Sequence, residues 1–225
     1  MKTLKIINTF ENEYVLGEAF KAIRTNILFS SHDTKVITLT SCDARDGKSA
    51  VSFEIAKSLS EVGRKVLYLD ADMRRSAFVI RHTTEKDLLG LSHFLSGQIE
   101  ASEMLFATDI PGLYVIPSGV YPPNPAELLS GPLFGDFIAD VRVKFDYFYI
   151  ETPPLGIVTD AAICTARSDG VIFLISSETT KIKQAREVKR MLEKTGTKLI
   201  GCILNKVKYK GKRSYYKKGY YRYGY

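Results

Sequence analysis

The chain has 225 residues, of which 45% are hydrophobic and 25% are charged, a composition typical of a soluble globular protein with one domain of ordinary size. The net charge of +7 comes from one end, because residues 206–225 contain eight Lys or Arg and no Asp or Glu. The three cysteines do not have the spacing of metal ligands, and they are too few for a disulfide framework. Without a signal-peptide core or an apolar run near the roughly 18–20 residues of a membrane span, the sequence also excludes an integral membrane protein.

Predicted strands and helices alternate along the chain after an amphipathic helix expected at about 14–30. The apolar, β-branched runs predict strands at 36–41, 65–70, 113–119, 146–151, 170–176 and 198–204. Helical patterns lie at about 48–62, 88–96, 126–143, 159–167 and 181–194. Continuous apolar strands separated by helices favour an α/β fold with a mostly parallel central sheet and helices on both faces. The pattern stops near residue 207, so we expect one domain, 1–206, and a disordered tail, 207–225.

The first main strand runs into SCDARDGKSA, and a helical pattern follows directly. GKS between a strand and a helix is the end of a P-loop, in which Gly47 lets the backbone approach phosphate, Lys48 reaches the phosphate oxygens and Ser49 binds Mg²⁺. The full P-loop pattern is not met, because Cys42 stands in place of its first glycine. The tripeptide alone is also compatible with a surface loop, and only its context favours a nucleotide site.

Carboxylates follow two other predicted strands. LYLDADMRRS places Asp70 and Asp72 at the carboxyl end of a strand, where open α/β sheets bind ligands, and their spacing puts both on one face. A loop salt bridge with Arg74 and Arg75 is the alternative. YIETPP places Glu151 at the end of another strand. Three carboxylates and a serine around one Mg²⁺ suit phosphoryl transfer, which needs positioning and charge neutralisation.

These motifs together resemble those of the bacterial tyrosine kinases (BY-kinases) of capsule and exopolysaccharide synthesis, which are relatives of the Min/Par-type ATPases. The P-loop corresponds to the family's Walker A motif, LYLDADMR is similar to Walker A′, and FYIETPP is similar to Walker B. SGVYPPNPAELL, at 118–129, resembles a P-P-N-P-x-E-L-L segment typical of the family, and a tyrosine-rich C-terminus completes the likeness. The resemblance covers the chain from about residue 14 onward and implies a P-loop NTPase-like fold that uses ATP and Mg²⁺.

The resemblance also implies roles for individual residues. Lys48, Asp70 and Asp72 are the expected catalytic residues, with one of the two aspartates accepting the phenol proton. Ser49, Asp72 and Glu151 are expected to hold the metal. The expected nucleotide contacts are Asp43, Ala44, Arg45, Asp46, Gly47, Lys48, Ser49, Ala50, Asn205 and Lys206.

The chain departs from the family pattern at two places. In the P-loop, the family usually has a Lys and often a Pro and a Gly at the positions of Asp43, Ala44 and Arg45. At the end of Walker B, the family usually has Asp where this chain has Glu151. With Asp46, the loop therefore carries two acids near the expected phosphates. A weakly active kinase is an alternative that these departures leave open.

Two charged features suggest how the chain assembles and what it modifies. Glu18, Lys21 and Arg24 resemble the family's E-x-x-R-x-x-R subunit contact and imply a ring-like homo-oligomer, although a solvated helix face has the same spacing. The expected phosphoacceptors are Tyr215, Tyr216, Tyr220, Tyr221, Tyr223 and Tyr225. A Par/Min-type positioning ATPase with a DNA- or lipid-binding tail is the alternative, but it leaves the tyrosines unexplained, and no nucleic-acid partner is expected.

Partners and location follow from the resemblance alone. Some family members are fused to a transmembrane adaptor and others are separate chains, and this chain resembles the separate form. We therefore expect a cytoplasmic protein that a transmembrane polysaccharide co-polymerase-type adaptor recruits to the inner face of the cell membrane and activates, with a tyrosine phosphatase as antagonist. The predicted function is ATP-dependent tyrosine autophosphorylation of the tail, between subunits, which regulates capsule or exopolysaccharide synthesis or export.

Overall fold

The computed structural model describes residues 1–7, 14–30, 33–177 and 179–208. The strands are β1 (Thr3–Leu4), β2 (Val36–Ser41), β3 (Val66–Asp70), β4 (Phe106–Thr108), β5 (Leu113–Ile116), β6 (Tyr147–Glu151), β7 (Gly170–Ser176) and β8 (Lys198–Asn205). The helices are α1 (Tyr14–Ser30), α2 (Lys48–Ser60), α3 (Phe78–His82), α4 (Leu91–Leu95), α5 (Pro125–Ser130), α6 (Pro132–Lys144), α7 (Asp160–Ala166) and α8 (Ile182–Glu193). None of these described helices has the length and apolar character that a membrane span requires.

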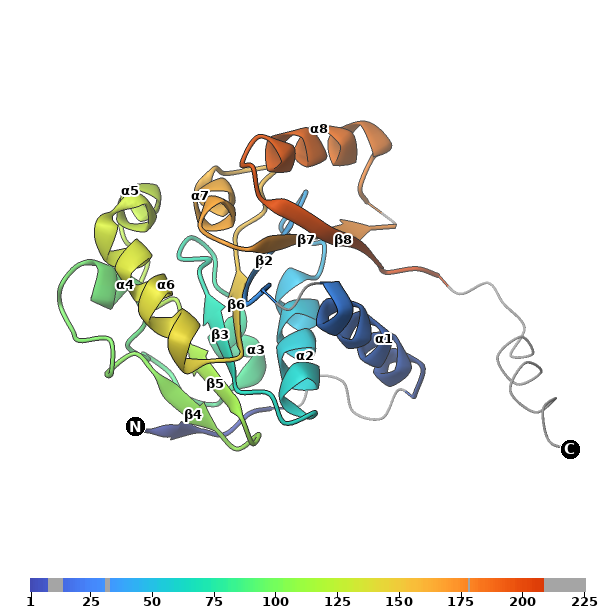
Figure 1. The fold of residues 1–225 in the computed structure, drawn as a ribbon. Helices are drawn as coiled ribbons and strands as arrows, with labels where there is room; N and C mark the ends of the chain where they lie inside the picture. The colour runs from blue at the N-terminus through green and yellow to red at the C-terminus, as the bar shows by residue number, and fades with distance from the viewer. Residues whose placement is uncertain (8–13, 31–32, 178, 209–225) are drawn as a thin grey trace, which may run out of the picture.

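In the described part of the chain the strands form one eight-stranded sheet, in the order β1-β4-β5-β3-β6-β2-β7-β8 (Figure 1). The strands from β5 to β8 in this order are parallel to one another. Strand β4 pairs antiparallel with β5, and β1 pairs parallel with β4. The mostly parallel sheet predicted from the continuous apolar strands is therefore confirmed.

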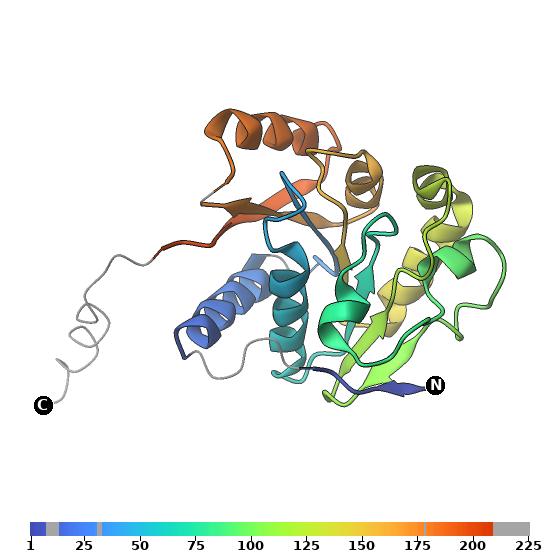
Figure 2. The same ribbon diagram turned by 180° about the vertical axis from the view of Figure 1, so that it is seen from behind.

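Helices cover both faces of the sheet, as predicted (Figures 1 and 2). Successive side chains of a strand point to opposite faces, so each central strand contributes to two cores. Leu67 and Ile150 pack with the core beneath α4, α5 and α6, whereas Tyr68 and Tyr149 pack with the core beneath α1, α2 and α3. Helix α8 lies over β7 through Val188 and Leu192, in a third cluster that includes α7.

Several predicted boundaries were wrong. The helix expected at 126–143 is two helices, because Gly131 is extended and Pro132 begins a new helix. A residue before proline is biased away from the helical region, and proline cannot donate the hydrogen bond that would continue a helix. The helix expected at 88–96 is only Leu91–Leu95, and the strand expected at 113–119 ends at Ile116. Strands β1 and β4 and helix α3 were not predicted, since each is too short to show a period.

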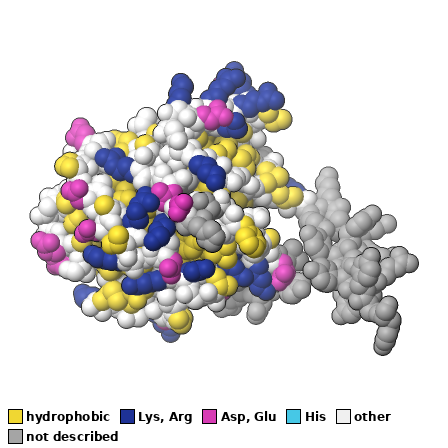
Figure 3. All heavy atoms as spheres, in the orientation of Figure 1, with side chains coloured by type: hydrophobic (Ala, Val, Ile, Leu, Met, Phe, Trp, Pro, Cys, Tyr) yellow, Lys and Arg dark blue, Asp and Glu magenta, His cyan; other side chains and the backbone are white. Residues whose placement is uncertain are grey.

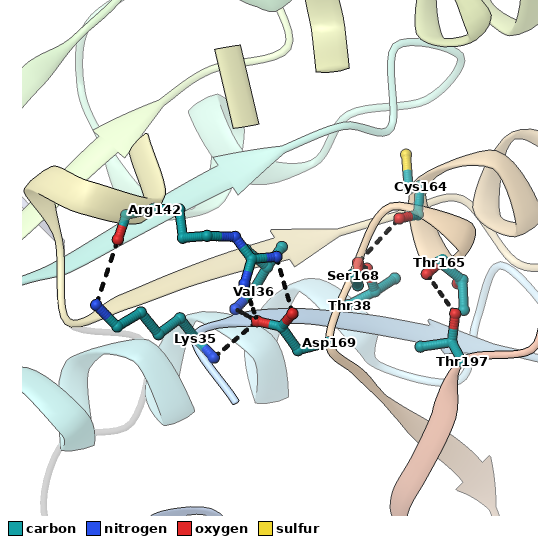
Figure 4. Close-up of polar contacts among 9 residues, drawn as sticks. All are labelled: Lys35, Val36, Thr38, Arg142, Cys164, Thr165, Ser168, Asp169 and Thr197. Atoms are coloured by element: carbon teal, nitrogen blue, oxygen red, sulfur yellow. Dashed lines mark hydrogen bonds and ion pairs between the residues drawn. The ribbon is translucent and has the colours of Figure 1, made fainter. Parts of the chain in front are cut away.

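Asp169, the residue before β7, ties three elements together at the end of the sheet away from the P-loop (Figure 4). Its carboxylate accepts hydrogen bonds from the backbone N–H groups of Lys35 and Val36, at 2.9 and 2.8 Å, where β2 begins. It also accepts two from the guanidinium of Arg142 in α6, at 3.0 and 2.8 Å. Burial raises the pKa of Asp169, but these hydrogen bonds outweigh burial and hold the pKa below its ordinary value of 3.8.

Replacing Asp169 with Asn should lower the free energy of unfolding by about 1–3 kcal/mol at neutral pH, because Arg142 loses a charged partner. A lowered pKa in the folded state means that this stabilisation is present above the ordinary carboxyl pKa and is lost as the pH falls through the folded value. Urea unfolding followed by circular dichroism should therefore show the two proteins converging in acid. The exposed Asp136 provides the control, and Asp136→Asn should change stability by less than about 0.5 kcal/mol.

Candidate active site

The loop between β2 and α2 is held by the end of β8. Gly47 has a φ of 93°, in the left-handed region, and a Cβ added there would lie 2.5 Å from the amide nitrogen of Asn205. The Asn205 side chain donates to the backbone carbonyl of Asp46 at 2.8 Å, and the ammonium of Lys206 donates to that of Arg45 at 2.5 Å. Asn205 and Lys206, which the sequence predicts as nucleotide contacts, thus lie at the loop and brace its backbone.

The two acids in the loop bond with the loop itself. The carboxylate of Asp46, which is buried, accepts from the backbone N–H of Asp43 at 2.8 Å and from the hydroxyl of Thr179 at 3.4 Å. The carboxylate of Asp43 accepts from the N–H of Ala44 at 2.6 Å. Backbone N–H groups of a P-loop are the donors that cradle phosphates. Two of these donors are therefore already bonded to carboxylates of this chain.

Asp70 and Glu151 lie side by side at the ends of β3 and β6, where the register pairs them directly. Both side chains are buried. Burial, and then the neighbouring charge of Glu151, raise the pKa of Asp70 well above its usual range. Burial also raises the pKa of Glu151, and the positive charge of Lys48, from the first turn of α2, offsets only part of this rise. Two adjacent buried carboxyls with one ammonium form a site that further positive charge would stabilise.

Ser49 and Tyr68 orient the Glu151 carboxylate. The hydroxyl of Ser49 donates to one oxygen at 2.5 Å, and the hydroxyl of the buried Tyr68 donates to the other. Sequence reasoning missed Tyr68, because an aromatic residue in an apolar strand is usually core. Its position two residues before Asp70, and hence on the same face of β3, is the signal that could have indicated it.

Asp72 lies next to this pair, and its backbone N–H donates to the Asp70 carboxylate at 3.0 Å. Its carboxylate accepts from the backbone N–H groups of Arg74 and Arg75, at 3.2 and 2.9 Å, so it stabilises its own loop. Within the described residues, no three acidic, His or Cys side chains gather closely enough to hold a metal ion, and the expected triad of carboxylates is not assembled. Ser49 and Glu151 are the predicted metal ligands that the structure brings together, and their oxygens fit a hard cation such as Mg²⁺ that keeps several water ligands.

An ion pair that the sequence did not predict joins the loop after β3 to the first residue of α7. The guanidinium of Arg74 donates to both oxygens of Asp160, at 2.7 and 3.0 Å, and the Asp160 side chain is fully buried. The predicted alternative of a salt bridge to Asp72 therefore does not form with Arg74. Asp70, in the same loop region, accepts from the N–H of Asp72 at 3.0 Å and from the hydroxyl of Ser76.

The predicted subunit-contact residues on α1 do not behave alike. Lys21 forms an ion pair with Glu18 at 2.8 Å, and both side chains are more than half exposed. Arg24 turns inward and donates to the carbonyl and the hydroxyl of Ser58 in α2, at 3.0 and 3.2 Å. Arg24 therefore also joins two helices of one chain. The predicted phosphoacceptors, Tyr215 to Tyr225, lie outside the described residues.

Comparison with known proteins identifies the family. Residues 34–200 match a family model described as an AAA domain. The tyrosine-protein kinase CpsD of Streptococcus agalactiae is 39% identical over 190 residues, which cover 84% of this chain and 83% of the relative. This chain belongs to the bacterial tyrosine-protein kinases. The tyrosine-protein kinase YwqD of Bacillus subtilis (strain 168) is 34% identical over 222 residues, covering 96% of this kinase and 90% of YwqD.

Solved structures agree with this assignment. The chimerical protein CapA2B2 matches the kinase with a TM-score of 0.82 and 28% identity, over 92% of this chain and 94% of that one. The kinase domain of the Escherichia coli tyrosine kinase ETK matches with a TM-score of 0.81 and 28% identity, over 92% and 80%. The septum site-determining protein MinD of Pyrococcus horikoshii, at 22% identity and a TM-score of 0.64, shares the fold.

Replacing Gly47 with Ala should weaken binding of MgATP by roughly tenfold, because a left-handed residue with a Cβ costs about 1–2 kcal/mol and the added atom displaces Asn205 from the loop. Isothermal titration calorimetry measures the affinity. Gly63→Ala is the matched control, since Gly63 also has a positive φ, of +79°, but has open space around it. The two variants should lose similar stability, while only Gly47→Ala loses affinity. Equal affinities would contradict the role given to this glycine.

Proposed function

We propose that this kinase transfers the γ-phosphate of ATP to tyrosines of its own tail, and that the site just described performs the transfer. The observation that carries the proposal is the buried pair of Asp70 and Glu151 beside Lys48 and Ser49, at the carboxyl ends of parallel strands. Ligands bind at this end of an open α/β sheet. Phosphoryl transfer requires positive charge and fixed geometry around the phosphates more than covalent chemistry.

Each residue has a defined task in this proposal. Lys48 and the backbone N–H groups of the P-loop hold the β- and γ-phosphates. Ser49, Asp72 and Glu151 would hold Mg²⁺. When bound, the Mg²⁺ ion neutralises the charge that develops on the phosphate oxygens. Asn205 and Lys206 keep the loop in the conformation that receives the nucleotide.

We propose Asp70 as the residue that accepts the phenol proton, with Asp72 as the alternative. A phenol titrates near pH 10, so a positioned carboxylate must help it lose its proton. The two oxygens of Asp70 accept from the N–H of Asp72 and from the hydroxyl of Ser76, so an incoming phenol would take the place of Ser76. In Asp72, the backbone N–H groups of Arg74 and Arg75 bind one of the two oxygens.

The remaining assignments rest on the family and on the sequence. We propose that residues 1–206 are the kinase domain, that Glu18, Lys21 and Arg24 contribute to a ring-like homo-oligomer, and that the tail is modified between subunits. We also propose that the chain is cytoplasmic and that a transmembrane adaptor recruits it to the membrane. A phosphatase would act as its antagonist, and the regulated process would be capsule or exopolysaccharide export. Identity of 34–39% to tyrosine-protein kinases favours this proposal over a Min-type ATPase, for which the likeness is one of fold.

Lys48→Met should reduce phosphate incorporation from radiolabelled ATP by at least about 100-fold, because it removes the charge on the transferred phosphate and little packing. The exposed Lys144 provides a control of the same chemistry, and Lys144→Met should label like the unmodified kinase. Circular dichroism of the three proteins should match. A Lys48→Met protein that is folded and labels normally would show that the P-loop assignment is wrong.

Transfer between subunits can be tested with two complementary chains. One carries Lys48→Met and an intact tail, and the other is active but has phenylalanine in place of the tail tyrosines Tyr209, Tyr215, Tyr216, Tyr220, Tyr221, Tyr223 and Tyr225. After mixing with ATP, mass spectrometry should locate phosphate on the tail of the inactive chain. An unlabelled tail, under conditions where the unmodified kinase labels itself, would leave only transfer within one chain.

A further inference from the structure

Helix α8 carries a row of basic side chains on the side opposite its buried face. Val188 and Leu192 are buried against the sheet. Since each helical residue turns by about 100°, the residues that lie opposite to them can be read from the sequence. They are all basic and all exposed, and we call them the α8 basic row: Lys183, Arg186, Arg190 and Lys194. Figure 3 shows Lys and Arg side chains gathered at the top of the molecule, over α8.

The charge of this row is not neutralised within the chain. The acids of α8 lie beside the row, and Glu193 forms an ion pair with Lys189. Across residues 1–7, 14–30, 33–177 and 179–208, no ion pair involves a member of the row. With Glu187 beside them, the four basic residues of the helix and its C-cap leave a net positive charge facing solvent, an arrangement that favours an anionic partner.

A hollow of about 460 Å³ lies along the same helix. It is lined by residues of α8 alone: Lys183, Arg186 and Arg190 are basic, Glu187 adds one carboxylate, and Ile182, which is 72% exposed, gives it an apolar side. Guanidinium groups bind phosphate oxygens in pairs of parallel hydrogen bonds, and an apolar side chain packs against an aromatic ring. The hollow thus combines the two contacts that a phosphotyrosine side chain needs.

The tail leaves the domain close to the amino end of α8. At the end of β8, the N–H and the hydroxyl of Ser177 donate to the carbonyls of Asn205 and Lys206, at 2.9 and 2.6 Å. Helix α8 begins only five residues after Ser177, and Figure 1 shows the two ends on the same side of the molecule. Residues 209–225 can span up to roughly 55–60 Å, which exceeds the length of α8, about 18 Å. The tyrosines from Tyr215 onward, seven or more residues beyond Lys208, therefore have enough chain to reach the α8 basic row.

Phosphorylation reverses the sign of the interaction between this segment and α8. Residues 209–225 contain six Lys or Arg and no acid, so the unmodified segment is repelled by the row. Each phosphate adds about −1.5 to −2 charges, and four of them cancel or exceed the six positive charges. The spacing also fits, because Tyr215–Tyr216 and Tyr220–Tyr221 are separated by about 17 Å in extended chain, and Lys183 and Lys194 by about 16 Å along the helix.

We propose that α8 is a docking site for the phosphorylated tail of the same chain, with Arg186 and Arg190 binding phosphotyrosine. The inference rests on the proposed function, since the phosphates are its product. Before the reaction, repulsion by α8 leaves the tail available to a neighbouring active site. After the reaction, the modified tail is held on its own domain, so that each chain retains its product away from the catalytic centres.

Anionic lipid is the other partner that a basic row could attract. Three observations favour the tail instead: the tyrosine spacing matches the row, the hollow offers an apolar wall beside the guanidinium groups, and the covalent connection keeps the segment at an effective concentration of about millimolar. A lipid surface would use neither the tyrosine spacing nor the covalent connection.

Binding of a synthetic peptide to an inactive kinase tests the proposal without requiring catalysis. A fluorescent peptide of residues 209–225, phosphorylated on Tyr215, Tyr216, Tyr220 and Tyr221, is titrated with the full-length Lys48→Met chain and followed by anisotropy. Unphosphorylated peptide should show no saturable binding. The double variant Arg186→Ala/Arg190→Ala, made in the Lys48→Met chain, should bind the phosphopeptide at least roughly tenfold more weakly, since two charge-assisted contacts are lost.

The matched control removes two exposed positive charges elsewhere, as Lys86→Ala/Lys144→Ala, and should retain affinity within about threefold, as expected for a change in overall charge alone. A full-length Lys48→Met chain whose own tail was phosphorylated by an active partner should bind the peptide more weakly, because its tail occupies the site. Equal loss in both double variants would overturn the proposal. A second outcome would also overturn it. If phosphatidylserine vesicles displace the phosphopeptide from the Lys48→Met chain, and the same vesicles do not bind the Arg186→Ala/Arg190→Ala variant, then the row binds the membrane.

Discussion

The buried carboxyls of Asp70 and Glu151 impose the constraint on which the site depends. They lie side by side because β3 and β6 are neighbours in register, and burial makes a negative charge on either of them costly. The surrounding side chains partly offset the cost of this buried charge. Lys48 brings positive charge, and Ser49 and Tyr68 each donate to one oxygen of Glu151. An arrangement that accepts more positive charge is suited to a metal-bound nucleotide, which supports the phosphate site that we propose at this end of the sheet.

Two contacts from distant parts of the chain fix the loops around this pair. Asn205 holds the backbone of the P-loop at a position where only glycine fits easily, and Arg74 holds buried Asp160 at the start of α7. The first contact has a further consequence, because Asn205 ends the strand from which the tail departs. The start of the tail thus touches the P-loop, through the bond from Lys206 to the carbonyl of Arg45. The P-loop and the segment that we propose as substrate are therefore held at the same place.

The charges of the tail and of α8 bear on where the tail lies before and after the proposed phosphorylation. The tail is basic and α8 presents a basic row, so on our proposal an unmodified tail is repelled by α8. Phosphates on the tail would reverse this repulsion. The number of phosphates, rather than the identity of any one tyrosine, would then decide where the tail lies, which would account for a cluster of acceptors in place of a single site.

The sequence by itself determined the local features: the apolar strands, the helices on both faces, and the GKS, DAD and IET segments, because their signals lie within a few consecutive residues. It did not determine contacts that depend on strand order. Tyr68 meets Glu151 across 83 positions and Arg74 meets Asp160 across 86, and such pairs form only once β3 and β6 are neighbours. The break at Gly131 was missed because the apolar spacing continues through it, and β1 and β4 exist only because longer strands offer an edge to pair with. The α8 basic row was present in the sequence, but its place beside the start of the tail was decided by the tertiary structure, which aligns the ends of β7 and β8.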